Sequence, residues 1–276
     1  MTNEYFGGLD FGSSGARISI IDKSKEIIFE DSCIYNNEFK NTEGWINSCI
    51  KLFEGIPIQI KINLSRLSIS GTSGTLVPCS SNGAPLGNSI PYYEVCTSNP
   101  EKLNLIAGAD KFLNNPYSSL AKAIKLIDTY GDNIILRHQA DWISGWFLND
   151  WSFGEEGNNL KLGWNIANKS WPESFESFAL TKSIPIIKKS GSILGKINQS
   201  IANLLGTSDH LLLISGTTDS NAAFIAAEVK ENEGLTILGT TIVLKKIIKK
   251  TFSHPGITMH RVNGEWICGG SSNAGC

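Results

Sequence analysis

The sequence predicts an α/β protein whose ligand site lies along one edge of a sheet. Strand-like runs end in loops of glycine, serine and threonine, and they alternate with segments of helical periodicity. The chain has 276 residues, of which 41% are hydrophobic, enough for two domains or for one domain and part of another. In such a sheet the carboxyl ends of the strands form the binding edge.

A glycine-rich turn between two short strands comes first. The stretch 8–17, Gly-Leu-Asp-Phe-Gly-Ser-Ser-Gly-Ala-Arg, is flanked by an apolar pair and an alternating run. Gly12 permits the backbone conformation that a turn around an anion needs, while Ser13 and Ser14 add hydroxyl donors beside the exposed N–H groups. The turn therefore predicts a phosphate site.

A carboxylate ends the first of these strands and faces the same space. Asp10 would repel a bare phosphate, but it could hold a magnesium ion directly or through its water. Together the turn and the carboxylate predict a site for a metal nucleotide. An ordinary glycine-rich hairpin with a solvated aspartate explains the same residues, because short turns of this kind are common.

The next elements continue the alternation of strands and helices. The pattern predicts, in order, a strand at 26–34, an amphipathic helix at 42–53, a strand at 65–70, a small-residue loop at 71–74 and a strand at 75–78. A turn at 80–87 is expected to join two segments of the same sheet.

Helical periodicity dominates from residue 100 to residue 148, where two apolar stripes predict core packing. Five tryptophans follow closely in sequence: Trp142, Trp146, Trp151, Trp164 and Trp171. Aromatic faces with polar edges suit a sugar site. Packing between helices is the more frequent role of any one of them.

A second strand–turn–strand unit lies near the end of the sequence. A strand and a helix at 191–206 lead to an apolar strand at 210–215, the segment Gly-Thr-Thr-Asp at 216–219 and a helix of small residues at 220–227. Residues 234–244 again indicate a strand, a Gly-Thr-Thr turn and a strand. Two such turns facing each other would hold a triphosphate from both sides.

Asp219 is the candidate catalytic residue. It follows a strand and precedes small residues, so its carboxylate would face the cleft and could take a proton from an attacking alcohol. A general base of this kind contributes roughly 10² to 10⁴ in rate. The alternative is that Asp219 caps the following helix, since aspartate is a favoured N-cap.

Charge and cysteine content exclude several classes of function. The net charge of −2 gives no basic field for nucleic acid or an anionic membrane, and the lysine cluster at 245–250 fits the polar side of a strand end. No apolar run reaches membrane-spanning length, and no signal-peptide pattern precedes the first strand. The six cysteines lack zinc-site spacing, which predicts free thiols. A cytoplasmic enzyme fits best.

Several motifs, in this order, resemble those of the FGGY carbohydrate kinases, which belong to the sugar kinase, Hsp70 and actin superfamily. They are Asp-Phe-Gly-Ser-Ser-Gly-Ala-Arg at 10–17, Ile-Ser-Gly-Thr-Ser-Gly-Thr-Leu at 69–76, Ala-Asp-Trp-Ile at 140–143, Asn-Leu-Lys-Leu-Gly at 159–163, Ser-Gly-Thr-Thr-Asp-Ser at 215–220 and Leu-Gly-Thr-Thr-Ile-Val-Leu at 238–244. The closest similarity is to the plant and cyanobacterial D-ribulose kinases described as xylulose-kinase-like, and it covers essentially the whole chain.

The resemblance implies a ribonuclease H-like (actin-like ATPase) fold with a complete first domain and an incomplete second one. Residues 1–208 would form the N-terminal sugar kinase domain, and residues 209–276 would begin the nucleotide-binding domain. The implied reaction is ATP-dependent phosphorylation of a primary hydroxyl of a small sugar, most closely a ketopentose such as D-ribulose or xylulose, with Mg²⁺.

The resemblance also assigns roles to particular residues. Asp219 matches the catalytic base beside the sugar, and Asp10 matches the metal-associated aspartate, which also borders the substrate. The first phosphate loop corresponds to Gly12, Ser13, Ser14 and Arg17, and the second to Gly239, Thr240 and Thr241. Gly71, Thr72 and Tyr92 fall where the family lines its sugar pocket. Asp141 is expected to be a helix N-cap.

The sequence departs from the family pattern in two segments near the sugar. Residues 91–94 are Pro-Tyr-Tyr-Glu where relatives carry a segment of the Met-Tyr-Asn-Asp type, and Glu155 and Glu156 replace the usual acidic residue ahead of the Asn-Leu-Lys-Leu-Gly motif. Both changes would alter which sugar fits, because pocket shape decides among similar sugars.

Family members continue beyond the motif at 238–244 with further helices, strands and a glycine-rich adenine-binding segment. We therefore expect a truncated second domain with weak nucleotide affinity and an apolar surface on the sheet that contains 235–244. A separate C-terminal fragment could complement it. Truncation could leave the isolated chain inactive.

Functions of other classes make different demands on the sequence. A non-catalytic sugar-binding or regulatory module on the same fold would bind sugar without consuming ATP. An Hsp70-like or actin-like ATPase would share the two phosphate hairpins but would not need the Gly-Thr-Thr-Asp segment. A Rossmann dehydrogenase is disfavoured because no Gly-x-Gly-x-x-Gly follows the first strand and opens a helix.

Overall fold

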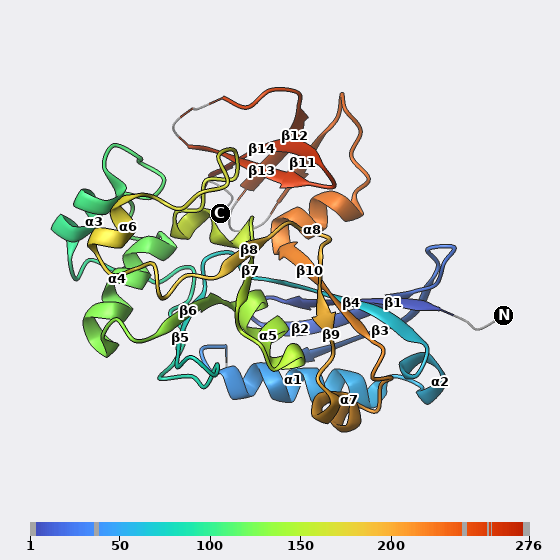
Figure 1. Ribbon diagram of the computed structural model, residues 1–276. Helices are drawn as coiled ribbons and strands as arrows, with labels where there is room; N and C mark the ends of the chain where they lie inside the picture. The colour runs from blue at the N-terminus through green and yellow to red at the C-terminus, as the bar shows by residue number, and fades with distance from the viewer. Residues whose placement is uncertain (1–3, 36–38, 239–241, 253, 255, 273–276) are drawn as a thin grey trace.

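A six-stranded mixed sheet forms the centre of the computed structural model (Figure 1), which describes residues 4–35, 39–238, 242–252, 254 and 256–272. In spatial order its strands are β3 (Ile27–Ile34), β2 (Gly15–Ile21), β1 (Tyr5–Phe11), β4 (Leu64–Gly71), β10 (Leu212–Thr218) and β9 (Ile193–Lys196). β1, β4 and β10 are parallel, and the other neighbouring pairs are antiparallel. The predicted first hairpin is confirmed as β1 and β2.

Three helices cover one face of this sheet: α1 (Thr42–Gly55), α5 (Gln139–Leu148) and α7 (Gln199–Leu205). Their apolar residues, such as Phe53 and Phe147, pack against strand residues such as Leu9 and Leu67 in one buried core. α1 begins where the Asn41 side chain accepts a hydrogen bond from the Glu43 backbone N–H. A short helix, α2 (Ile58–Lys61), connects α1 to β4.

A second group of elements extends from one end of the sheet around its own core, which includes Leu120, Leu136 and Phe175. Its elements are β5 (Leu76–Cys79), α3 (Pro100–Ala107), α4 (Ser119–Tyr130), β6 (Ile135–His138), β7 (Phe153–Glu155), the 3-10 helix η1 (Asn158–Leu162), α6 (Ser174–Ser177) and β8 (Ile186–Lys188). β5 pairs with β6, and β7 with β8, in two-stranded sheets.

The predicted role of the turn at 80–87 was wrong. β5 exists, but it pairs with β6 and not with the central sheet, so the turn does not join two segments of that sheet. Pro78, within β5, lacks a backbone N–H and therefore suits a short edge strand better than a central one.

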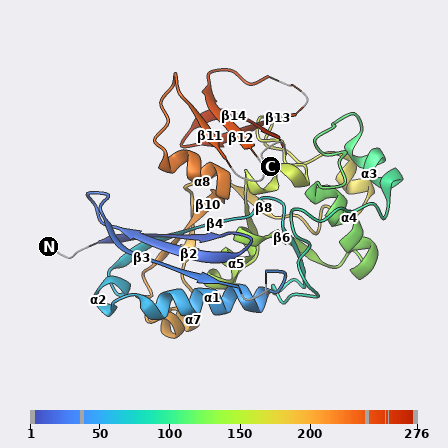
Figure 2. The same ribbon diagram turned by 180° about the vertical axis from the view of Figure 1, so that it is seen from behind.

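A four-stranded antiparallel sheet lies beyond α8 (Asp219–Ala226), on the side of the central sheet opposite α1 and α7 in both Figures 1 and 2. Its strands, in spatial order, are β11 (Gly234–Ile237), β12 (Ile242–Ile248), β14 (Glu265–Ser272) and β13 (Ile257–Val262). Phe224 of α8 packs with Val262 and Ile267 in a small core. Leu238 and Leu244 are exposed, which agrees with the apolar surface expected there.

The central sheet continues past residue 208, where the sequence suggested a division between domains. β10 lies between β4 and β9, so residues 212–218 complete the first sheet before α8 leads to the second. No helix in the described ranges is both long enough and apolar enough to cross a bilayer.

The tryptophans and cysteines mainly serve packing. Trp142 is buried, lies edge-on to Trp45 and donates its indole N–H to the Gly83 carbonyl. The cysteines that the structure describes are free thiols, as expected, and all except Cys268 are buried.

Candidate active site

Strand register brings three loops to one edge of the central sheet. Asp10 of β1 lies opposite Ser70 of β4, and Ser70 lies opposite Thr217 of β10. Two residues further along each strand, Gly12, Thr72 and Asp219 begin the loops or helix that follow. Because the three strands are parallel, these segments leave the sheet at the same edge, the place where α/β sheets bind ligands.

Asp10 is half-buried at this edge, where the Ser70 hydroxyl donates a hydrogen bond of 2.8 Å to its Oδ1. Arg17 lies opposite Asp10 in the antiparallel β1–β2 register, so both side chains are on one face of the sheet. Their assignment to one ligand site stays a prediction.

The turn between β1 and β2 is tight. The Gly12 N–H donates to the Gly15 carbonyl at 3.0 Å, and the side chains of Ser13 and Ser14 are exposed. A Cβ at Gly15 would lie 2.1 Å from the Cys33 carbonyl oxygen of β3, which explains why no larger residue fits. The exposed residues Ser13 and Ser14 could donate hydrogen bonds to an anion, so the phosphate site stays a prediction.

Asp219 is the first residue of α8 and is exposed, with its Oδ1 accepting a hydrogen bond of 2.6 Å from the Ser220 backbone N–H. The N-cap position is occupied by Thr218, so the alternative role of Asp219 as the cap is not what the structure shows. Desolvation by the surrounding protein raises the pKa of Asp219, and the negative charge of Asp10 raises it further. The hydrogen bond from the Ser220 N–H lowers this pKa and so opposes the shift.

Gly216 lets β10 approach β4 closely just before Asp219. A Cβ at Gly216 would lie 1.8 Å from the Ile69 carbonyl oxygen, and the β10–β4 register shifts between Ile214 and Thr217. The irregularity therefore depends on glycine and sets where the strand delivers Asp219.

The predicted sugar-pocket residues are tied together by buried hydrogen bonds. Thr72 donates from its N–H and its hydroxyl to Gln139 Oε1, at 3.0 and 2.7 Å, and its Oγ1 lies 2.7 Å from Thr75 Oγ1. The Tyr92 N–H donates to Thr75 Oγ1 at 3.2 Å, while the Tyr92 side chain is 39% exposed. Gly71 is buried beside Gln139. A Cβ at this position would lie 3.1 Å from Gln139 Oε1.

Two lysines that the sequence analysis did not assign to the site lie close to Asp219. Lys161 of η1 donates from Nζ to the Ser73 carbonyl at 3.0 Å, and Lys245 of β12 donates to Ser220 Oγ at 3.0 Å. Both charges lower the pKa of Asp219. Lys245 was expected on the polar side of a strand end, but it is 5% exposed because strand alternation turns it inward and turns Lys246 outward.

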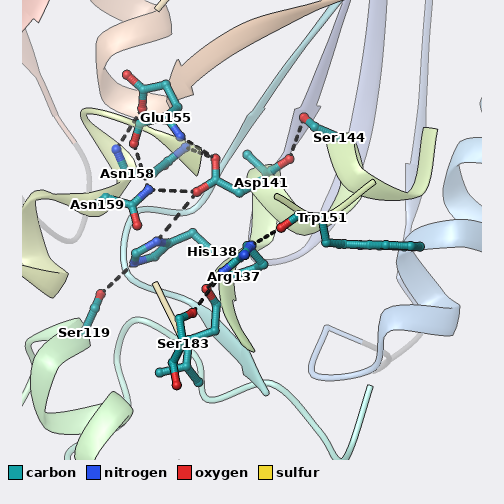
Figure 3. Close-up of polar contacts among 12 residues, drawn as sticks. Ser119, Arg137, His138, Asp141, Ser144, Trp151, Glu155, Asn158, Asn159 and Ser183 are labelled. Carbon is teal, nitrogen blue, oxygen red and sulfur yellow. Dashed lines mark hydrogen bonds and ion pairs between the residues drawn. The ribbon is translucent and has the colours of Figure 1, made fainter. Parts of the chain in front are cut away.

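A buried polar network lies behind this edge (Figure 3). Asp141 accepts hydrogen bonds from the Glu155 N–H at 3.0 Å and from Asn159 Nδ2 at 2.9 Å. Burial raises the pKa of Asp141 to about 6 and that of Glu155 to about 8. His138, whose Nε2 lies 2.9 Å from Ser119 Oγ, is neutral because burial lowers its pKa to about 3.

The prediction that Asp141 caps a helix was wrong. His138 occupies the N-cap position of α5, and Asp141 lies three residues further on, where it joins α5 to β7 and η1. The sequence signal was the pair of adjacent asparagines, Asn158 and Asn159, whose amides need buried acceptors.

The second predicted phosphate loop, Gly239, Thr240 and Thr241, lies outside the described residues, although its flanking strands β11 and β12 pair as expected. In the described ranges no group of three or more His, Cys, Asp or Glu side chains could hold a metal ion by itself. Asp10 nevertheless fits Mg²⁺, because this ion is commonly held by one or two carboxylates together with substrate phosphates.

No family model matches this chain. Comparison with solved structures defines the class of fold: the chain has the α/β fold of the sugar kinases, which is the predicted actin-like ATPase fold. The xylulose kinase of Rhodospirillum rubrum matches 97% of this chain with a TM-score of 0.84 and 16% identity, over 60% of its own chain.

Two further kinases have the same fold. The gluconate kinase of Lactobacillus acidophilus matches 99% of this chain with a TM-score of 0.82 and 14% identity, over 60% of its own length. The Plasmodium falciparum glycerol kinase, solved with ADP, matches 98% with a TM-score of 0.77 and 15% identity, over 61% of its length. The chain thus spans about three fifths of the proteins it matches.

Proposed function

We propose that this chain carries the acceptor site and the catalytic base of an ATP-dependent carbohydrate kinase. The acceptor would be a primary hydroxyl of a small sugar, with D-ribulose as the first candidate and xylulose as the second. The observation that carries the proposal is the exposed carboxylate of Asp219 at the sheet edge that Asp10 and the turn at 12–14 share. The kinase neighbours supply the fold-level support.

Asp219 would act as the general base. Its carboxylate can accept the proton of the attacking hydroxyl only when ionised, and the charges of Lys161 and Lys245 favour the ionised form. The sugar would lie between Asp219 and the loop that contains Gly71 and Thr72, with Tyr92 at its exposed side.

The phosphate groups of ATP would meet Gly12, Ser13, Ser14 and Arg17, and Gly239, Thr240 and Thr241 would form the opposite loop. Asp10 would hold Mg²⁺, which when bound would neutralise charge on the phosphates. Positioning and charge neutralisation supply most of the rate enhancement in phosphoryl transfer, so the base is one contribution among several.

We place the proposed division between the two domains after β10 instead of at residue 208. The first domain would then contain the whole six-stranded sheet, and the nucleotide-binding domain would begin with α8 and the second sheet. Asp219 would lie at the junction, where a base can face substrates held by both parts.

A panel assay tests the function. We would incubate the chain with ATP and Mg²⁺, add D-ribulose, xylulose, glycerol or gluconate in turn, and measure ADP release above the sugar-free rate. The proposal expects stimulation by a pentulose above that by glycerol or gluconate. Calorimetric binding of a pentulose without ADP release would favour the non-catalytic sugar-binding module, and failure of every sugar both to bind and to stimulate would contradict the proposal.

A further inference from the structure

Two lysines from distant parts of the chain meet beside Asp219. Lys161 belongs to η1, which the network of Asp141 holds in place, and Lys245 belongs to β12 of the second sheet. Lys161 Nζ bonds to the carbonyl of Ser73, the residue after Thr72. Lys245 Nζ bonds to Ser220 Oγ at 3.0 Å and to Asn221 Oδ1.

Among the residues that the structure describes, the hydrogen-bond acceptors of these two ammonium groups are neutral: a backbone carbonyl, a hydroxyl and an amide oxygen. Within the described part of the chain, no carboxylate lies at ion-pair distance from either one. Lys245 is buried and Lys161 is half-buried. A desolvated charge without a charged partner costs free energy.

Lys122 shows what a purely structural lysine in this protein looks like. It is completely buried on α4, and its Nζ donates to the backbone carbonyls of Tyr117 and Tyr92 at 2.6 and 3.4 Å. Lys161 and Lys245 differ because the carboxylate that both interact with is Asp219, the candidate base, whereas the one that Lys122 interacts with is Glu94. Both are also anchored next to Asp219, because Ser220 follows it in the chain and Ser73 lies two residues past Gly71, which pairs with Thr218.

Phosphoryl transfer would bring the negative charge of a phosphate group next to Asp219 and Asp10. The sugar oxygen attacks the γ-phosphorus while Asp219 takes the hydroxyl proton. A bond forms between the sugar oxygen and phosphorus, the bond from phosphorus to the bridging oxygen breaks, and ADP leaves with that electron pair. The new phosphate ester then lies beside the acid that accepted the proton and near Asp10. Fixed positive groups offset such repulsion.

We propose that Lys161 and Lys245 form an anion subsite beside Asp219 that binds the phosphate group as it arrives on the sugar oxygen. This inference rests on the proposed kinase function, but the subsite can be measured without turnover. Its ligand is a tetrahedral dianion, the phosphate of the sugar phosphate product.

Sulfate is the probe, because it is a tetrahedral dianion that does not titrate near neutral pH. Calorimetry at pH 7 would compare the unaltered chain with Lys161→Met, Lys245→Met and the control Lys246→Met, which alters the neighbouring exposed lysine of β12. We expect sulfate to bind about 10-fold more weakly to each of the first two variants, equivalent to about 1.4 kcal/mol, and unchanged to the control.

Thermal melting separates a subsite from a structural role. In the absence of sulfate, Lys161→Met should leave the melting temperature unchanged or higher, because it removes a desolvated charge. Lys245→Met also removes the donor to the buried Asn221 Oδ1, so its melting temperature is compared with that of Lys245→Arg, which keeps a donor. Sulfate also stabilises proteins generally by exclusion from their surface, and that part should be the same in all variants. Arginine variants, which keep the charge, serve if a methionine variant does not fold, and they should bind sulfate more tightly than the methionine variants.

Competition distinguishes the source of the anion. A ribulose phosphate ester should displace sulfate, whereas D-ribulose, which has no charge, should not. Displacement by ADP without any effect of the phosphate ester would place the anion on the nucleotide side and overturn the proposal. Burial and the charge of Lys161 lower the pKa of Lys245 to about 8, although the charge of Asp219 opposes this shift. Sulfate affinity should therefore also fall above pH 8, because Lys245 loses its positive charge.

Failure of the subsite and failure of the kinase function give different results. Equal sulfate affinity in all four proteins, together with pentulose-dependent ADP release, would reject the subsite and keep the kinase. Sulfate binding that requires both lysines, with no sugar able to bind or stimulate ADP release, would keep an anion site and reject the kinase.

Discussion

Acidic side chains gather in two neighbouring regions of this protein, and their surroundings are opposite. Asp10 and Asp219 lie at the open edge of the central sheet, each with few hydrogen bonds, and Asp219 is exposed. Asp141 and Glu155 are buried and receive hydrogen bonds from backbone N–H groups and asparagine amides. The carboxylates of the first region are free to meet a ligand, whereas those of the second region hold α5, β7 and η1 together through hydrogen bonds.

The two regions are joined physically. A small cavity of about 10 Å³, which has room for about one water molecule, is lined by Asp141 and Glu155 on one side and by Ser215 and Gly216 of β10 on the other. η1, which follows Glu155, carries Lys161 to the loop beside Asp219. The buried network therefore supports one wall of the candidate active site.

The largest effect is expected from Asp219→Asn, which removes the base and keeps the shape of the side chain. Sugar-dependent ADP release should fall by roughly 10² to 10⁴, while the melting temperature should change little because Asp219 is exposed and is not the N-cap. Asp209→Asn is a matched control on an exposed aspartate ahead of β10. Undiminished turnover in Asp219→Asn would refute its role as a base.

Gly216→Ala tests how the two regions are joined. The added Cβ would lie 1.8 Å from the Ile69 carbonyl oxygen, so β10 must shift away from β4. We expect a loss of about 3 kcal/mol or more in the free energy of unfolding, measured by urea titration. Gly191→Ala is not a steric match because its φ is positive, whereas Gly8→Ala, with 4.0 Å to the nearest atom, is a suitable control. Equal stability of the two variants would contradict the close approach.

Asp141→Ala should reduce stability in the buried region by about 2 to 3 kcal/mol, since the Glu155 N–H and the Asn159 amide would lose a buried acceptor. Urea unfolding measures this loss. Asp150→Ala removes a half-buried aspartate that caps a turn at Ser152 and interacts electrostatically with Arg137, and it should cost less. A greater loss from Asp150→Ala would show that the network does not hold α5, β7 and η1 together.

Taken per pH unit, the smallest effect is a pH dependence that belongs to the buried region. Burial raises the pKa of Glu155 from 4.5 to about 8, so the folded state binds a proton that the unfolded state releases. Stability should therefore be greatest below pH 4.5 for this group and should decline toward pH 8, by at most about 1.4 kcal/mol per pH unit. Glu155→Gln should flatten this decline in urea titrations at several pH values. The same slope in the variant would assign it to another group.

Much of the fold followed from local patterns. The alternation of apolar residues gave the strands of the first hairpin, and the glycine and hydroxyl residues at 12–14, 71–74 and 216–218 marked where strands end. Asp219 was placed correctly between a strand and a small-residue helix because both signals are local. Asp141 was misplaced because a capping residue and the centre of a network look the same when only neighbours in sequence are considered.

The amino-acid order by itself determined the first hairpin, α1, β4, β10 and the loops rich in small residues, because backbone preferences and side-chain periodicity act within a few positions. The stretch 100–148, predicted as helical, contains the strand β6, which forms because it pairs with β5. Tertiary structure alone decided that β5 pairs with β6, that Asp141 meets Glu155 and Asn159, and that Lys161 and Lys245 converge on Asp219. Those contacts join residues far apart in the chain. Their formation depends on strand register and on which face of an element becomes buried, and neither is fixed by the composition of a short segment.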